Sequence, residues 1–157
     1  MIRDQEALCH ILEVAHRAWL RDLSDRLATV RLPDASVWEH SSAARYLEEE
    51  FAPRFRREAG AVNAVADRLP PAEAVRLWAL GELIEFLRIY LAGLVQLAQS
   101  GAAFARLANK LLRAFECWCG EVEAIVAALP AEVVGPDLIR RFEQLPDGAD
   151  MVMQREF

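Results

Sequence analysis

Proline and glycine divide this chain into four long stretches, and each stretch repeats apolar residues at intervals of three and four. Such spacing places the apolar side chains along one face of an α-helix. The connections between the stretches are too short for anything except antiparallel neighbours. They fall at Pro33, at Pro70 and Pro71, at Ser100 and Gly101, and at Pro130. The sequence therefore predicts an all-α fold, arranged as an antiparallel up-and-down four-helix bundle.

We expect one helical-bundle domain over residues 1–157, because a chain of this length buries a sufficient core in one piece. Residues 1–130 form the predicted four-helix core, with helices over residues 3–30, 36–69, 71–99 and 102–129. Residues 131–157 carry an amphipathic segment at 137–145, predicted to be a short fifth C-terminal helix that caps one end of the bundle, followed by a tail.

The second helix has two local signals. Ser36 and Glu39 have the spacing of a capping box, in which each side chain satisfies a free backbone amide at the helix start. Pro53 lies inside the helical pattern, where its ring removes a hydrogen bond and crowds the preceding turn. We therefore predict that this helix begins at Ser36 and is kinked at Pro53.

Charge and composition exclude several classes of protein. The net charge of -6 disfavours nucleic acid as a partner, because that binding requires a basic surface. The most apolar stretch, residues 77–95, contains Glu82, Glu85 and Arg88, so we predict a buried helix and no membrane span. The charged N-terminus lacks the pattern of a secretory signal, and three cysteines without framework spacing suit a reducing compartment. The predicted location is the cytoplasm.

Glu13 and His16 have the spacing of half a ferritin-like metal motif, but the sequence has no second Glu-x-x-His. Reflecting residue numbers through the connections places His16 level with apolar residues Phe51, Ile89 and Leu112. His10 and His40 lie too far from His16 to share a metal with it. We therefore favour a core histidine with hydrogen-bond partners over a metal ligand, both for His16 and for His40.

The residues His16-Arg17-Ala18-Trp19 resemble the His-x-x-Trp of the first helix in chemoreceptor zinc-binding domains, four-helix sensors of bacterial chemotaxis receptors and diguanylate cyclases. That family also has a cysteine before its second helix and a downstream His-x-x-x-His. The corresponding stretch here, from Val37 to His40, has no cysteine, and no histidine follows it. The resemblance therefore implies a zinc-ligand role for His16 alone.

The same reflection places Glu58, Glu82, Cys9 and Cys119 at one height of the bundle, which makes this level the best speculative site. A carboxylate that faces a core must be paired or protonated. We favour the alternative that Glu58 pairs with an arginine or turns outward at the kink. Cys117 and Cys119 point away from each other on a helix, so they cannot hold one metal.

The third helix is apolar over more than half of its circumference. We expect Leu83, Phe86 and Tyr90, with their neighbours Leu80, Leu87, Leu94 and Leu97, to face the core. The opposite side then carries Ala74, Trp78, Gly81, Ile89 and Ala92. An apolar patch on a soluble chain usually marks an interface, so we predict that these five residues contact another copy or a helical partner protein.

The leading functional hypothesis is a non-enzymatic interaction or regulatory module that self-associates through this helix. A second class is a ligand- or metal-binding sensor bundle, and a third is a ferritin-like metal enzyme. No catalytic residue and no cofactor is predicted, because the sequence has no nucleophile-elbow context and no phosphate-binding loop. The weak metal candidates are His16, Glu13, Glu58 and Glu82.

Overall fold

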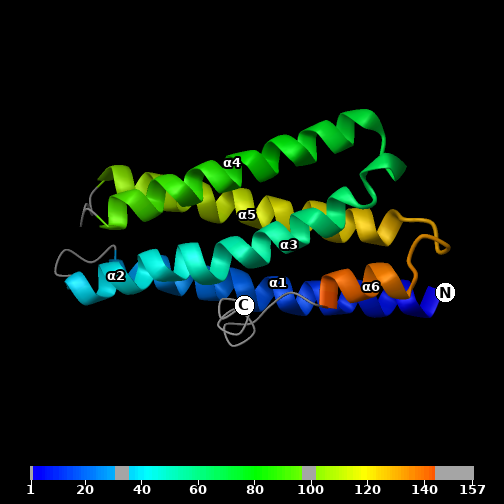
Figure 1. Cartoon of the computed structure of the whole chain (residues 1–157), viewed down its shortest axis with the longest axis horizontal. Helices are drawn as coiled ribbons and strands as arrows, with labels where there is room; N and C mark the ends of the chain where they lie inside the picture. Colours follow the sequence, from blue (N-terminus) through cyan, green and yellow to red (C-terminus); the bar gives the residue numbers. More distant parts are fainter. Residues whose placement is uncertain (1, 31–35, 97–101, 144–157) are drawn as a thin grey trace, which may run out of the picture.

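The computed structural model describes residues 2–30, 36–96 and 102–143, and all regular structure in these ranges is helical (Figure 1). The predicted all-α class is therefore confirmed. The elements are α1 (Ile2–Val30), α2 (Val37–Arg45), a π-helix η1 (Tyr46–Phe51), α3 (Ala52–Asn63), a 3-10 helix η2 (Ala66–Arg68), α4 (Pro71–Gln96), α5 (Ala102–Ala128) and α6 (Pro136–Glu143). The predicted breaks at Pro33, Ser100 and Gly101, the inward position of Leu97 and the tail beyond Glu143 lie outside the described residues.

The long helices lie side by side along the longest axis of the molecule (Figure 1). The most extensive packing joins α4 to α5 and α1 to α5, and α2 packs against α4. The short helix α6 lies alongside α1 and α3, where it buries Leu138 and Phe142. Its apolar face is thus covered by the chain itself.

The Ser36 half of the predicted capping box is confirmed at the start of α2. The Ser36 hydroxyl oxygen accepts a hydrogen bond from the Glu39 backbone N–H at 3.1 Å. This bond satisfies one of the amides that every helix start leaves without an intrahelical partner.

The interruption predicted at Pro53 takes the form of a π-helical segment. The chain stays helical from α2 through η1 into α3, and the Ala52 N–H bonds to the Leu47 carbonyl, five residues back. Proline supplies no N–H and its ring crowds the preceding turn, so a wider turn before it accommodates both effects. A π-helical turn is also a recognised cause of helix bending.

An aromatic cluster forms the centre of the core. The Phe115 ring centroid lies 4.6 Å from that of Trp19 and 5.2 Å from that of Phe51. Phe51 stacks on Phe55, and Phe55 packs against Trp118 at 4.9 Å. All five side chains are buried, so α1, η1, α3 and α5 share one core.

The face of α4 that packs against the core differs from the predicted one. Leu83, Phe86 and Tyr90 were expected in the core and are exposed, whereas Ala92 was expected on the outside and is buried. Leu87 is buried as expected, and the residues that share the core face are Leu77, Ile84, Leu91 and Val95. Apolar residues surround α4 on every side, so the sequence periodicity alone does not define which side faces the core. Within the described residues, no helix is both long and apolar enough to cross a membrane.

Candidate functional site

The most unusual chemistry in the structure is a buried histidine between two glutamates. His16 of α1 is only 3 % exposed. Its Nε2 lies 2.5 Å from Glu58 Oε1 on α3, and its Nδ1 lies 3.0 Å from Glu123 Oε2 on α5. We call His16, Glu58 and Glu123 the buried triad, although the side chain of Glu123, at its edge, is 27 % exposed. It joins three helices that are distant in the sequence.

The triad suits a protonated imidazole. Both ring nitrogens face a carboxylate oxygen, so with both carboxylates ionised each nitrogen must donate a proton. Burial lowers the pKa of His16, but the hydrogen bonds and charges of Glu58 and Glu123 raise it more, and the pKa ends above its usual value. The geometry therefore favours a cation held between two anions.

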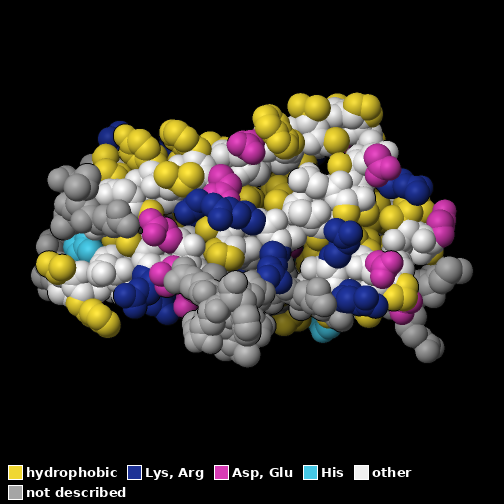
Figure 2. Space-filling model, in the orientation of Figure 1, with side chains coloured by type: hydrophobic (Ala, Val, Ile, Leu, Met, Phe, Trp, Pro, Cys, Tyr) yellow, Lys and Arg dark blue, Asp and Glu magenta, His cyan; other side chains and the backbone are white. Residues whose placement is uncertain are grey.

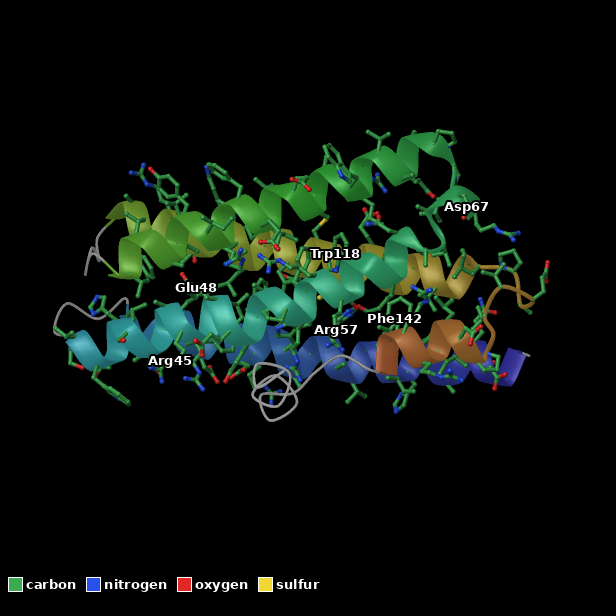
Figure 3. All side chains as sticks on the ribbon, viewed as in Figure 1. Arg45, Glu48, Arg57, Asp67, Trp118 and Phe142 are labelled. Atoms are coloured by element: carbon green, nitrogen blue, oxygen red, sulfur yellow. The ribbon has the colours of Figure 1, made fainter. Side chains whose placement is uncertain are left out.

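Trp118 completes the hydrogen bonding of Glu58. Its indole Nε1 donates to Glu58 Oε2 at 3.1 Å, so both oxygens of this fully buried carboxylate have a donor. Trp118 lies near the centre of the molecule (Figure 3) and also approaches α4. A Cβ added at Gly81 would lie 3.4 Å from the Trp118 ring. A methyl group at Gly81 would therefore be in van der Waals contact with Trp118, which shows how near α4 lies to α5 at this level.

Two thiols near the triad, those of Cys119 and Cys9, do not have the character of nucleophiles. Burial, together with the charges of Glu58 and Glu123, raises the pKa of Cys119 well above its usual range, so the thiol stays protonated. Cys117 is exposed, as the helical spacing predicted. Burial and the charges of Glu13, Glu123 and Glu6 also raise the pKa of the half-buried Cys9.

The structure brings together only some of the predicted metal candidates. His16 and Glu58 are in contact, while Glu13 is exposed on α1 and Glu82 is exposed on α4. No group of three or more possible ligands suited to a metal ion occurs among the described residues. His40 is buried, and its Nδ1 donates to the Ser36 carbonyl at 2.8 Å.

The expectation that His16 lies level with apolar residues alone is wrong. That expectation assumed the same rise per residue in every helix. The π-helical turn before α3 fits more residues into the same length, and long glutamate side chains can also contact residues above or below their own height. The alternative that Glu58 turns outward or pairs with an arginine is also wrong, because Glu58 faces the core and binds His16. Glu123 was missed, and its only signal is its position beside the buried Val122 at the edge of the α5 stripe.

A cavity of about 280 Å³ lies on the α4 side of Trp118. Side chains of α3, η2, α4 and α5 line it, and three of them are the aromatic residues Phe55, Trp78 and Trp118. Ala74 and Gly81, which were predicted to contact a partner, are half-buried and line this cavity instead of standing on the open surface. We call it the α3–α4 cavity.

An apolar surface covers the outer side of α4. Its members are 47 % to 65 % exposed and gather along the upper edge of the molecule (Figure 2): Val75, Trp78, Leu83, Phe86, Ile89 and Tyr90. We call these six residues the outer α4 face. Trp78 and Ile89 stand on it as the sequence predicted.

Two of the charges near the outer α4 face, Glu85 and Arg88, are paired within the chain, whereas Glu82 is exposed and has no ion pair among the described residues. Arg88 is buried and its guanidinium lies 2.7 Å from Glu85 Oε2. The other oxygen of Glu85 accepts from Arg56 of α3 at 3.0 Å. This charged network therefore takes Arg88 away from the outer α4 face.

Comparison with known proteins finds no matching family, no similar curated protein and no similar solved structure. The assignment of a function thus depends on the geometry described above.

Proposed function

We propose that this chain is a non-enzymatic interaction or regulatory module that forms a homodimer through the outer α4 face. In this proposal the helices form an antiparallel up-and-down four-helix bundle that serves as a rigid scaffold for the surface. The three free cysteines support a reducing location, and we propose the cytoplasm. The observation that carries the proposal is the exposure of six large apolar side chains on one helix.

The size of this surface supports a specific interface. Aromatic side chains present about 150–250 Å² each, so the exposed fractions of Trp78, Phe86 and Tyr90 alone correspond to roughly 260–440 Å² of surface. The exposed parts of Val75, Leu83 and Ile89 add to this area. The largest apolar patch on a typical monomer covers about 300–600 Å², and a standard interface buries about 800 Å² on each partner. The outer α4 face therefore approaches the area that one side of a stable dimer needs.

A second copy is the occupant that fits best. The outer α4 face extends over one helix and is centred close to Leu83, so a two-fold axis there would pair it with itself in antiparallel orientation. Val75 would then lie opposite the partner's Tyr90. Aromatic residues, which are enriched at interface cores, make up half of the face.

The buried triad supports a structural role in preference to catalysis. His16 and Glu58 are closed to solvent, and each of their side-chain polar atoms already has a partner. A general acid or base must come within hydrogen-bond reach of its substrate. We therefore interpret the triad as a clamp that holds α1, α3 and α5 in register behind the interface.

Charge insertion tests the proposal. Trp78→Glu and Phe86→Glu should each reduce the light-scattering mass of the protein from dimer to monomer, while the far-ultraviolet circular dichroism stays unchanged. The matched control is Val14→Glu, which places the same charge at an exposed apolar residue of α1 and should leave the dimer intact. A wild-type mass equal to that of one chain, or equal masses for all four proteins, would contradict the proposed interface.

A further inference from the structure

We propose that the α3–α4 cavity binds a small organic cation, in which an ammonium group is attached to a flat apolar body. This inference goes beyond the proposed dimer. The two share Trp78, which belongs to the outer α4 face and also lines the cavity, so the variants below avoid that residue. The cavity opens between α3 and α4, with Trp118 of α5 as one wall.

The cavity has room for a ring and a short side arm. An apolar cavity of about 150 Å³ accommodates benzene. The α3–α4 cavity, at about 280 Å³, is almost twice that size. It is close to the lower end of the range of about 300–1,000 Å³ that small-molecule sites occupy. A ligand the size of a monocyclic aromatic amine therefore fits this cavity.

The walls suit an aromatic ring and a cation. Trp78, which is 62 % exposed, supplies an open aromatic surface, and the buried Phe55 and Trp118 line the inner wall. Ammonium groups are attracted to the faces of aromatic rings. The N–H of Trp118 is already donated to Glu58, so this indole offers the cavity its ring and not a hydrogen-bond donor. Donation to a carboxylate also enriches the indole ring in electron density, which strengthens its attraction for a cation.

Among the described residues, one of the carboxylates that line the cavity has no ion pair. Glu85 and Arg56 both line the cavity and pair at 3.0 Å, and Glu85 also pairs with Arg88, which is buried and does not line the cavity. Glu82 also lines the cavity, is exposed, and forms no ion pair with any residue that the structure describes. One carboxylate therefore remains available to an incoming ammonium group.

Calorimetric titration with three probes of similar shape tests the charge preference: phenethylammonium, the neutral 2-phenylethanol and the anionic 3-phenylpropanoate. We expect phenethylammonium to bind with a Kd of about 0.1–1 mM, a value typical of a ligand with so few atoms. The alcohol should bind at least roughly tenfold more weakly and the carboxylate not measurably. Equal binding of the cation and the alcohol, or no heat of binding for the cation at about 10 mM, would overturn the proposal.

Variants locate the binding. Glu82→Gln should weaken phenethylammonium binding about five- to tenfold. Glu73→Gln removes an exposed carboxylate of the same helix that does not line the cavity, and should leave the affinity unchanged. An equal effect of both variants would show that the cation responds to the general charge of the chain, and would overturn the assignment to this cavity.

Filling the cavity provides a second test. Ala74→Phe on α4 and Ala59→Leu on α3 both place atoms in the space and should abolish binding. Two variants on opposite walls keep the test decisive if one of them fails to fold. Each titration is repeated with Phe86→Glu, whose altered residue lies outside the cavity, so that loss of the dimer and loss of ligand binding are observed separately. Undiminished binding to a folded, filled variant would refute the inference.

Discussion

The substitution His16→Leu tests the buried triad most sharply. It removes the cation between Glu58 and Glu123 and leaves a side chain of similar size. Glu58 is fully buried, so the variant must either retain an unpaired carboxylate in the core or protonate it. Loss of one partner from a buried ion pair destabilises a protein by about 3–5 kcal/mol.

The expected loss is large enough to measure by urea denaturation at pH 7 or by thermal unfolding. For a chain of this length, about 3–5 kcal/mol corresponds to a fall in Tm of roughly 6 to 20 °C. The control is His10→Leu, the same change at an exposed histidine of α1, which should alter the free energy of unfolding by less than about 0.5 kcal/mol.

A double variant separates charge from shape. In His16→Leu/Glu58→Gln no buried charge remains unpaired, and the amide oxygen still accepts from Trp118. We expect this protein to recover about 2 kcal/mol relative to His16→Leu, because replacing both charged partners is often tolerated where removing one is not. A His16→Leu protein as stable as the wild type, or a double variant less stable than the single one, would refute the triad.

Three further predictions concern single groups. Burial lowers the pKa of His16, but Glu58 and Glu123 raise it more, so the folded-state pKa lies above the usual value. The contribution of His16 to the free energy of unfolding should therefore be complete below about pH 6.5 and be lost as the pH rises through the folded-state pKa. If the stability of the wild type and of His16→Leu changed equally with pH, this prediction would be contradicted. In the native protein, Cys117 should react with a thiol reagent within minutes, whereas Cys119 should react only when the protein unfolds. Peptide mapping of the labelled protein checks this, and rapid labelling of Cys119 would disprove its burial. Gly81→Ala should raise the free energy of unfolding by up to about 1 kcal/mol, because alanine favours a helix over glycine and the new methyl group meets Trp118 at an ordinary contact distance. A loss of stability would show that this contact is too close.

The helices with one apolar stripe were predictable from the sequence. In α1 and α5 the apolar residues repeat at intervals of three and four along one stripe, and its members Leu12, Leu23, Phe115 and Val122 are all buried. A single stripe has one direction, so burial follows directly from the spacing. The outer side of α4 was predicted less well, since its apolar residues define no single direction and only contacts with α2 and α5 select the buried side.

The buried triad was predictable only in part. The sequence placed Glu58 inward and at the same height as Cys119, and the contact of Glu58 with the adjacent Trp118 agrees with that level. The same reasoning placed Cys9 of α1 there, whereas the structure places His16, seven residues later and therefore about 10 Å along the helix. Heights estimated from residue numbers assume a constant rise per residue. Local changes in that rise, such as the π-helix η1, add up along a long helix and shift the estimate.

Sedimentation equilibrium of the wild-type chain at several micromolar concentrations tests the central claim most directly. If the outer α4 face joins two copies, the mass should approach twice the 17.7 kDa of one chain, and Phe86→Glu should return it to that of a single chain. A wild-type mass of 17.7 kDa at every concentration up to about 100 µM would contradict the proposed dimer.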